Sequence, residues 1–438
     1  MSGFQFERPD RHTNGRCFLV QPKLKNGIVR RSPEACLGEA DGLATAILLH
    51  VVGAEIISIN KIDPGKYIGS GQAERIGNKL DDLNRPSLVI MNCALSPVQQ
   101  RNLERIWDTK VIDRTGLILE IFGARATTRE GRTQVELASL SYQRSRLVRS
   151  WTHLERQRGG LGFLGGPGES QLEIDRRLID ERMGRLKRDL NKIRKTRRIH
   201  RKARKRKPYE IISLVGYTNA GKSTLFNRLT KSHVVAQDQL FATLDPTHRA
   251  LKLPSGRQVV LTDTVGFISD LPTELVAAFR ATLEEISEAD ILIHVRDVSH
   301  ADTEAQCEDV MGVLSGLVRP DAQPPIEVLN KIDLLDEYRK VSLQGTNSFL
   351  AEQIPVSAMS GEGLNNLISV IEGVLDNAHA CHHIKVSLAD GAALAWLYRN
   401  GQVLERNDDD TFAHLAVTLN SIDYQRFNSL FPSLPTTK

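Results

Sequence analysis

Apolar runs alternate with amphipathic stretches along the first 133 residues of the chain. The apolar runs are rich in β-branched residues and predict strands, whereas the amphipathic stretches have the spacing of helices. Strands are predicted at 46–59, 87–92 and 110–114, and helices at 71–83 and 96–107. Because strands separated by helices pair in parallel, residues 1–133 are expected to form an α/β domain with a parallel sheet.

The pattern changes over residues 134–207, where apolar residues recur at spacings of three, four and seven. Two stripes follow this spacing, one at Leu140, Leu147, Trp151 and Leu154, the other at Leu172, Ile179, Met183, Leu186, Leu190 and Ile193. Between them, residues 159–168 hold six glycines and a proline, which cannot continue a helix. The sequence predicts a long antiparallel helical hairpin with a glycine-rich tip, whose stripes hold the two helices together.

Charge is distributed unevenly along the chain. The formal net charge is +5, yet residues 176–207 contain 17 lysines and arginines against three acidic residues, a local charge of +14. The second helix of the hairpin is therefore a basic element on an acidic body, which favours a polyphosphate partner. A solvated helix face is the alternative interpretation, although like charges at this density repel one another.

Composition excludes several classes of protein. The 40% hydrophobic and 25% charged residues are typical of a globular chain, and no apolar run approaches the ~20 residues that span a bilayer. The N-terminal residues lack the apolar core of a secretory signal. The five cysteines are scattered and odd in number, which favours reduced thiols. We therefore expect a cytoplasmic protein.

Buried-strand patterns return after Pro208. The apolar run 211–216 leads into GYTNAGKST and then a helix-like stretch, the context that a phosphate-binding loop requires. The predicted loop comprises Gly216, Tyr217, Thr218, Asn219, Ala220, Gly221, Lys222, Ser223 and Thr224. Its glycines let backbone amides surround phosphates, Lys222 supplies charge to the β- and γ-phosphates, and Ser223 offers a hydroxyl to Mg²⁺.

A second motif follows 41 residues after Lys222, where the apolar run 259–263 ends in Asp263. The motif continues with Thr264, Val265 and Gly266. A carboxylate at the carboxyl end of a strand can hold Mg²⁺ through water, and a glycine lets its amide approach the γ-phosphate. We expect Asp263 and Gly266 in these two roles.

The strand-like runs 326–329 and 354–356 are each followed by residues suited to reading a base. These candidates are Asn330, Lys331, Asp333, Ser357 and Ala358. The Asp333 carboxylate can accept hydrogen bonds from guanine N1–H and the 2-amino group, which adenine lacks. The Lys331 stem can lie over the base, and an amide of the second loop can reach guanine O6. Together the motifs predict GTP or GDP as the ligand.

The segment 241–247 lies where a nucleotide-sensitive switch is expected. Thr243 is our first choice for its Mg²⁺-binding threonine and Thr247 the second, with Lys222, Thr243 and Gly266 as the catalytic set. Phe267 stands where many GTPases place a glutamine that orients water, so slow hydrolysis, accelerated by a partner, is expected. Asn219 resembles the asparagine of GTPases that use K⁺.

This constellation resembles that of the translation-factor-like GTPases, and the chain from about residue 40 to 376 resembles the HflX family of ribosome-associated GTPases. The resembling segments outside the nucleotide motifs are DPGKYIGSGQAERI at 63–76, 110–138, RGGLGFLGGPGESQLEIDRR at 158–177, and 271–285. The chain has Gly165 where many members place an arginine, and Ser170 where many have threonine.

The resemblance implies binding to the 50S ribosomal subunit and splitting or rescue of stalled 70S ribosomes, with the tip directed toward the peptidyl-transferase region and the basic helix on ribosomal RNA. The candidate RNA contacts are Arg158, Gly159, Gly160, Arg176 and Arg177. A GTP-controlled RNA- or membrane-associated scaffold is the alternative function. A tRNA-modification GTPase is a narrower rival, but the C-terminal end lacks that class's cysteine.

The expected architecture is an N-terminal parallel-sheet α/β domain at 1–133, the hairpin at 134–207, a Ras-like P-loop GTPase domain at 208–376 and a small C-terminal domain at 380–438. The last contains an acidic turn at 407–410 and ends in PSLPTTK, which predicts irregular structure. A monomer is expected, because the apolar stripes pair within the chain.

Overall fold

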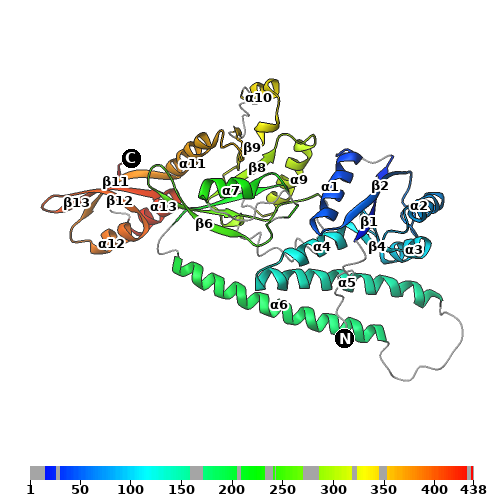
Figure 1. The fold of residues 1–438 in the computed structure, drawn as a ribbon. Coiled ribbons are helices and arrows are strands. Elements are labelled where there is room, and N and C mark those ends of the chain that lie inside the picture. The colour runs from blue at the N-terminus through cyan, green and yellow to red at the C-terminus, as the bar shows by residue number, and fades with distance from the viewer. Residues whose placement is uncertain are drawn as a thin grey trace.

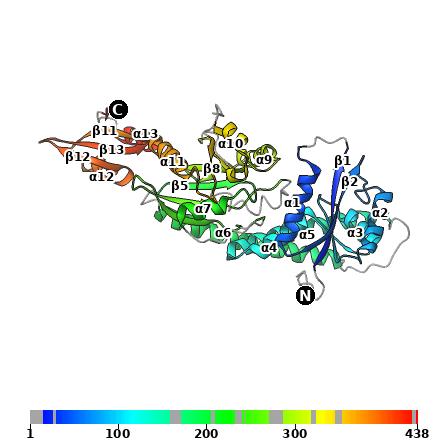
Figure 2. The same cartoon turned by 45° about the horizontal axis from the view of Figure 1, so that its top comes forward.

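The protein is described from a computed structural model (Figure 1). The structure describes residues 15–25, 30–157, 171–204, 209–231, 240–241, 243–269, 286–317, 323–344, 353–431 and 436–437. Figures 1 and 2 show that residues 211–378, where the nucleotide motifs predict a GTPase-type domain, lie between the N-terminal and C-terminal domains. The two long helices of the hairpin run beneath the N-terminal and GTPase-type domains.

The N-terminal domain is built on a four-stranded parallel sheet of order β2-β1-β3-β4. Its elements are β1 (Arg16–Leu24), α1 (Pro33–Ala46), β2 (His50–Ile59), α2 (Ser70–Asp82), β3 (Leu88–Met91), α3 (Pro97–Trp107), β4 (Lys110–Asp113) and α4 (Arg114–Arg125). The predicted parallel sheet is confirmed. The predicted strand 46–59 is too long, because α1 ends at Ala46 and a turn with Leu48 at φ 63° precedes β2.

The hairpin consists of α5 (Arg129–Gln157) and α6 (Gln171–Arg204), which lie side by side. Arg182 pairs with Glu136 at 2.7 Å and Arg144 with Asp180 at 2.6 Å, as antiparallel helices require. The stripe residues Met183, Leu186 and Leu190 are buried. The helix begins at Arg129, five residues before the expected boundary, and the predicted tip 159–168 lies outside the described residues.

The GTPase-type domain has a six-stranded sheet of order β10-β9-β8-β5-β7-β6, in which only the edge strand β6 pairs in the antiparallel direction. Its elements are β5 (Ile211–Gly216), α7 (Lys222–Thr230), β6 (Thr247–Lys252), β7 (Gln258–Asp263), β8 (Ile291–Asp297), α9 (Thr303–Ser315), β9 (Ile326–Asn330), η1 (Ile332–Leu334), α10 (Glu337–Gln344), β10 (Gln353–Pro355) and α11 (Leu364–Ala378).

The C-terminal domain is an antiparallel sheet of order β12-β13-β11-β14 with two helices. Its elements are β11 (His379–Ser387), α12 (Gly391–Asn400), β12 (Gln402–Asp408), β13 (Phe412–Asn420), α13 (Ser421–Leu430) and β14 (Thr436–Thr437). The acidic turn is present, since Asp409 accepts from the Thr411 and Phe412 amides. The prediction of an irregular end is wrong at β14, which adds to the edge of the sheet.

One hydrophobic core joins the N-terminal domain to the GTPase-type domain. Buried residues from β1, α1, α4 and α5 pack in the same cluster as Phe241, Leu244 and Phe267. The rings of Phe122 in α4 and Phe241 meet edge to face with centroids 4.7 Å apart. The segments around the predicted nucleotide site therefore pack against the N-terminal domain.

Candidate nucleotide site

The phosphate-binding loop connects β5 to α7, and two of its glycines are required by their surroundings. Gly216 has φ 150° and Gly221 has φ 92°, conformations that side chains disfavour. A Cβ at Gly216 would lie 2.2 Å from the Val295 carbonyl oxygen, and one at Gly221 would lie 2.1 Å from Nδ2 of Asn330. The loop can therefore turn its backbone inward only with glycine at these positions.

Lys222 opens α7 and is buried, with its ammonium group lying across the loop. Its Nζ donates to the Tyr217 carbonyl at 2.7 Å and to the Gly216 carbonyl at 3.1 Å. Burial lowers the pKa of Lys222 to about 8. An ammonium has three donors, so one remains for a phosphate oxygen. Gly266 lies beside it, where a Cβ would come 3.0 Å from Nζ.

Three side-chain oxygens converge next to this lysine. Ser223 Oγ donates to Asp263 Oδ2 at 2.7 Å, Thr243 Oγ1 donates to the same oxygen at 2.9 Å, and the two hydroxyls are 2.8 Å apart. Oxygens bound to one Mg²⁺ are separated by roughly 3 Å, because Mg²⁺ takes near-octahedral oxygen ligands at ~2.1 Å. The donor set therefore fits Mg²⁺.

Asp263 has a second feature that fits a cation. It is fully buried at the end of β7, and its Oδ1 has no hydrogen-bond partner among the described residues. Burial raises the pKa of Asp263, although Ser223 and Lys222 oppose this shift. A cation beside the carboxylate would favour its ionised form. The structure places Thr243 in this group, whereas Thr247 begins β6 and pairs with Asp263 only through the strand register.

The base-reading residues lie at the carboxyl ends of β9 and β10. Asn330 joins two loops, since its Nδ2 donates to the Ala220 carbonyl at 2.8 Å and its Oδ1 accepts from the Ala358 amide at 3.0 Å. The Ser357 amide donates to the Glu362 carbonyl at 3.0 Å. Guanine O6 would share the Ala358 amide with Asn330, and the contact between this amide and O6 stays a prediction.

Lys331 and Asp333 complete this edge of the site. Lys331 adopts φ 67°, and its ammonium forms a 2.7 Å ion pair with Asp297 at the end of β8. This pair fixes the lysine stem, and Asp297 was not among the predicted residues. Asp333 lies in η1 with its carboxylate exposed to solvent, where an incoming base can reach it.

Most of the remaining residues of the phosphate loop and of the motif at 263–266 form hydrogen bonds within the domain or are buried. Thr264 donates from Oγ1 to the Leu214 carbonyl at 2.6 Å, and Val265 is buried. Thr218 donates its amide to the Phe267 carbonyl at 2.7 Å, which ties the phosphate loop to the segment after Gly266. Asn219 is exposed at the loop apex with φ 60°. Thr224 lies in the first turn of α7.

A buried polar cluster behind the phosphate loop was missed by sequence reasoning. Tyr217 turns its hydroxyl away from the loop, toward Arg31, Glu39 and Ser269. Arg31 Nη1 donates to Glu39 Oε2 at 2.7 Å and to Ser269 Oγ at 2.9 Å. Arg114 donates from Nη2 to Glu39 Oε1 and to the Ser269 carbonyl. Only tertiary structure brings these residues together.

Two guanidinium groups share the Glu39 carboxylate in this cluster, and Arg31 also pairs with Asp302 at 3.4 Å. Glu39 is 6% exposed, and both of its guanidinium partners are 7% exposed. Burial alone would raise the pKa of Glu39, but Arg114 and Arg31 outweigh this effect and hold the pKa below its ordinary value. Burial, together with Glu39, raises the pKa of the Tyr217 phenol. The hydroxyl therefore remains protonated as a donor to the carboxylate.

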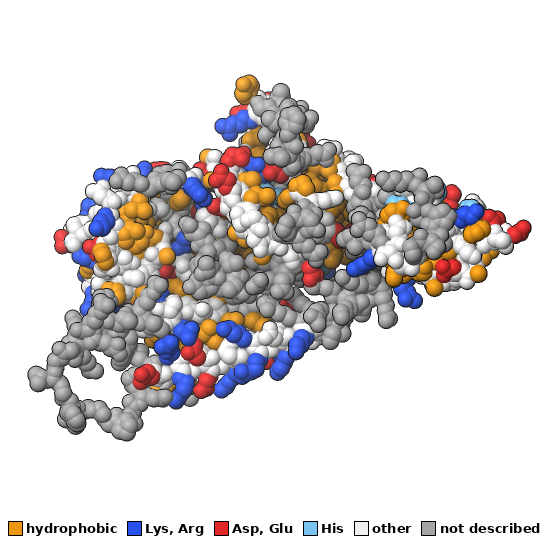
Figure 3. Space-filling model, turned by 180° about the vertical axis from the view of Figure 1, so that it is seen from behind, with side chains coloured by type: hydrophobic (Ala, Val, Ile, Leu, Met, Phe, Trp, Pro, Cys, Tyr) orange, Lys and Arg blue, Asp and Glu red, His pale blue; other side chains and the backbone are white. Residues whose placement is uncertain are grey.

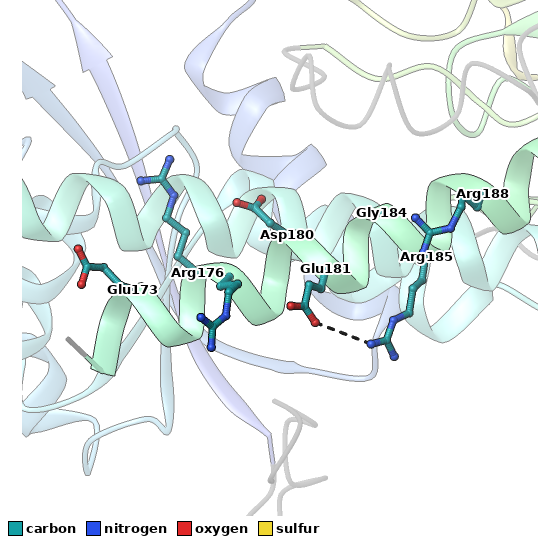
Figure 4. Close-up of a pocket in the computed structure, with 8 residues that line it drawn as sticks. Glu173, Arg176, Asp180, Glu181, Gly184, Arg185 and Arg188 are labelled. Carbon is teal, nitrogen blue, oxygen red and sulfur yellow. Dashed lines mark ion pairs between the residues drawn. The ribbon is translucent and has the colours of Figure 1, made fainter. Parts of the chain in front are cut away.

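The predicted RNA-contact residues are only partly described. Arg158, Gly159 and Gly160 lie outside the described residues, as does the whole segment 271–285. Arg176 and Arg177 are exposed near the start of α6. They line a surface hollow with Glu173, Asp180, Glu181, Gly184, Arg185 and Arg188 (Figure 4). Basic side chains continue along this helix on the face shown in Figure 3.

Comparison with known families gives four consecutive matches. The models "GTP-binding GTPase N-terminal", "GTP-binding GTPase Middle Region", "50S ribosome-binding GTPase" and "HflX C-terminal domain" match residues 34–123, 125–204, 211–331 and 344–429. The likeness thus extends past residue 376, where the sequence motifs ended. No helix among the described residues is long and apolar enough to cross a membrane.

Similar proteins cover most of the chain. GTPase HflX of Magnetococcus marinus is 46% identical over 92% of both chains, and GTPase HflX of Escherichia coli is 42% identical over 85% of this chain and 86% of its own. Putative GTP-binding protein 6 of Xenopus laevis is 35% identical over 95% of this chain and 80% of its own.

Solved structures give weaker matches. A GTP-binding protein from Sulfolobus solfataricus in complex with GDP matches with TM-score 0.44 and 24% identity over 83% of this chain and 99% of its own. Era in complex with MgGDPNP and 16S ribosomal RNA nucleotides matches with TM-score 0.32 and 22% identity over 38% of this chain and 56% of its own.

The six-stranded sheet and the loop that crosses from β5 to α7 define a P-loop GTPase, which binds guanine nucleotides and hydrolyses GTP. With relatives of this identity and coverage, the chain belongs to the HflX family of GTPases.

Proposed function

We propose that this GTPase binds the 50S ribosomal subunit, splits or rescues stalled 70S ribosomes, and is released when GTP is hydrolysed. The observation that carries the proposal is the basic helix α6, which presents Arg176, Arg177 and Arg185 to solvent. Lysines and arginines that neutralise RNA phosphates supply affinity without sequence readout. The match of residues 211–331 to the 50S ribosome-binding GTPase model supports the same partner.

The nucleotide site then works as follows. Amides of the phosphate loop and Lys222 bind the β- and γ-phosphates, while Ser223 and Thr243 orient hydroxyls toward the metal position. Mg²⁺, when bound, would supply positive charge to the phosphate oxygens. Asp263 holds that position from β7, and the Gly266 amide faces the γ-phosphate.

Guanine is recognised at the other end of the pocket. Asp333 accepts hydrogen bonds from N1–H and the 2-amino group, and Lys331, held by Asp297, covers the base plane. Adenine offers neither donor, so an adenine base that covers the carboxylate displaces water without replacing its hydrogen bonds, which costs about 1–3 kcal/mol. This difference selects GTP over ATP.

Hydrolysis by the isolated protein is slow, and a ribosomal particle accelerates it. Phe267 is 2% exposed, and its phenyl ring packs in the shared core. A ring held there cannot orient an attacking water, so the stabilisation that glutamine supplies in other GTPases is absent from this position. We infer further that K⁺ bound near Asn219 assists; exchange of K⁺ for Na⁺ should then lower turnover without changing nucleotide affinity.

The protein acts as a monomer in this proposal, because the apolar residues Met183, Leu186 and Leu190 are buried within the hairpin. Sedimentation of the purified chain tests this statement directly. A concentration-dependent dimer would contradict it.

The central test measures the GTPase rate of the full chain alone, with 50S subunits and with 70S ribosomes, together with gradient sedimentation of the particles. We expect strong stimulation and conversion of 70S ribosomes to separate subunits. Stimulation and binding without subunit separation would favour the alternative, a GTP-controlled RNA-binding scaffold. No stimulation and no co-sedimentation would refute the ribosomal role.

A further inference from the structure

The carboxylate of Asp245 accepts hydrogen bonds from the two residues that immediately precede the hairpin helix α5. Its Oδ2 accepts from the Thr127 amide at 3.1 Å, the Thr127 hydroxyl at 2.8 Å and the Thr128 amide at 2.9 Å, and its Oδ1 accepts from the Thr128 hydroxyl at 2.6 Å. Burial would raise the pKa of Asp245, but these donors outweigh it and lower the pKa. The carboxylate therefore stays ionised at neutral pH.

This contact lies at the positive end of α5. Thr128 Oγ1 accepts from the Gly131 amide at 2.9 Å and so caps the helix, and an ionised carboxylate beside a helix N-terminus is further stabilised by the aligned peptide dipoles. Gly131 leaves the space that Asp245 occupies, since a Cβ there would lie 2.4 Å from Oδ1. The first turn of α5 is thus shaped to receive Asp245.

Asp245 is also two residues from Thr243, whose hydroxyl lies 2.8 Å from Ser223 Oγ and 2.9 Å from Asp263 Oδ2. Leu244, between them, is buried in the core shared with the N-terminal domain. The same segment therefore contacts the Mg²⁺ position with one residue and the base of the hairpin with another.

The segment on the other side of Thr243 is also held by the N-terminal domain. Phe241 packs its ring against Phe122 of α4 and adopts φ 56°, a conformation that is unfavourable in a bulky residue and persists only under external constraint. Leu240 lies against α1, where a Cβ at Gly42 would come 3.1 Å from Leu240 Cδ1. Thr243 therefore lies between two attachment points on the same domain.

We propose that Asp245 is a positioning residue: anchored on Thr127 and Thr128, it holds Thr243 in place for Mg²⁺ and the γ-phosphate, and it ties the base of the hairpin to the nucleotide state. This proposal rests on the proposed nucleotide site, and it adds an energetic coupling between that site and helix α5. Coupling between two sites is reciprocal, so a γ-phosphate that stabilises Thr243 also stabilises the contact between Asp245 and α5.

Asp245→Asn tests the positioning role in the full chain. The amide can present one acceptor oxygen where the carboxylate presents two, so part of the anchor is lost. With Mg²⁺ present, the affinity for a fluorescent non-hydrolysable GTP analogue should fall about tenfold, within the range of coupling between sites. The affinity for fluorescent GDP should change less than about twofold, because the switch threonine is held by contacts that need the γ-phosphate.

Gly131→Ala provides a second variant that leaves the switch segment untouched. Alanine favours the helix more than glycine does, so the fold should be retained while the new Cβ displaces Asp245. The same selective loss of GTP-analogue affinity is expected. Gly123→Ala in α4 is the matched control, since a Cβ there meets no atom within 4 Å and should change neither affinity.

Hydrogen exchange gives a readout that a merely structural role would not change. The amides of Thr127 and Thr128 donate to Asp245, so in the wild type they should exchange about tenfold more slowly with the Mg²⁺-bound GTP analogue than with GDP, by the reciprocity of coupling. In Asp245→Asn this difference between nucleotides should vanish.

The outcomes separate the two proposals. Equal losses of GTP-analogue and GDP affinity in both variants, or identical exchange at Thr127 and Thr128 in both nucleotide states, would overturn the positioning role and leave the GTPase site intact. A wild type that fails to bind the GTP analogue with Mg²⁺ would remove the nucleotide site and the positioning role with it. A wild type that binds but ignores 50S subunits would refute only the ribosomal role.

Discussion

The hydroxyl of Tyr217 donates a 2.6 Å hydrogen bond to Oε2 of Glu39, which lies 178 positions earlier in helix α1. Tyr217 is the second residue of the phosphate loop, so this bond joins the nucleotide site to the N-terminal domain. Ser269, which follows Gly266 and Phe267, contacts the same tyrosine at 3.1 Å. The phosphate loop and the segment that follows Gly266 therefore share one buried anchor outside the GTPase domain.

Removing the charge at the centre of this anchor should destabilise the protein. Glu39→Gln removes the carboxylate that pairs with the buried guanidinium groups of Arg31 and Arg114, and leaves Arg31 only its longer pair with Asp302 at 3.4 Å. Breaking a buried ion pair costs about 3–5 kcal/mol. Denaturant titration followed by circular dichroism measures the change. Glu34→Gln, which is exposed on the same helix, is the control and should cost less than about 1 kcal/mol. Equal stability of the two variants would contradict the buried role.

The anchor also predicts a direction of pH dependence. The pKa of Glu39 in the folded protein is held below its ordinary value, so its stabilisation is complete above the ordinary glutamate pKa. That stabilisation is lost as the pH falls through the lower, folded-state pKa. The difference in unfolding free energy between wild type and Glu39→Gln should therefore shrink as the solution is acidified. A difference that grows toward acid would show that the sign is wrong.

Phe267→Gln should fail to accelerate hydrolysis. The side chain at this position points into the shared core, so a glutamine there buries an amide and does not reach water near the γ-phosphate. We expect a loss of about 3 kcal/mol in stability and no increase in the single-turnover rate. Phe267→Leu keeps an apolar side chain and should cost less than about 2 kcal/mol. A faster glutamine variant would disprove the packing argument.

Asp333→Asn should change the base preference. Asparagine presents a donor where guanine also presents donors, whereas xanthine offers a carbonyl at position 2. GTP affinity should fall about 10- to 100-fold and xanthosine triphosphate affinity should rise, as measured by competition with a fluorescent nucleotide. Asp336→Asn is the control, because Asp336 accepts from the Arg339 amide and asparagine serves equally well at such a helix cap. Unchanged guanine preference would reject the assignment of Asp333.

Neutralising the start of α6 should weaken ribosome binding and reduce its salt dependence. Each arginine that no longer neutralises an RNA phosphate lowers the slope of log affinity against log salt by about 0.7–0.9. Arg176→Gln with Arg177→Gln should therefore lower the slope by up to about 2 in sedimentation assays over a range of salt concentrations. Lys61→Gln with Arg101→Gln removes two exposed charges from the N-terminal domain and should have no such effect. Equal slopes for both pairs would exclude these arginines as phosphate-binding residues.

The local spacing of apolar residues predicted many of the helices and strands, because this spacing reflects which face of each element is buried. The heptad spacing of Met183, Leu186 and Leu190 indicated a packed helix, and the structure buries all three. Other boundaries depended on partners that lie far away in sequence. The run 46–59 is largely apolar, so periodicity could not separate the end of α1 from the start of β2. Thr436 and Thr437 form a strand only because β11 offers an edge.

The order and spacing of the nucleotide motifs were determined by the sequence, because each motif is a short segment whose backbone conformation and chemistry are local. Gly216, Gly221 and Asp263 could be assigned without any knowledge of distant contacts. The tertiary structure alone decided that Thr243 rather than Thr247 contacts Ser223, that Tyr217 turns toward Glu39, and that Asp245 binds Thr128 at the start of α5. These relationships join residues 20 to 178 positions apart, and packing of the domains against one another brings them within hydrogen-bond distance.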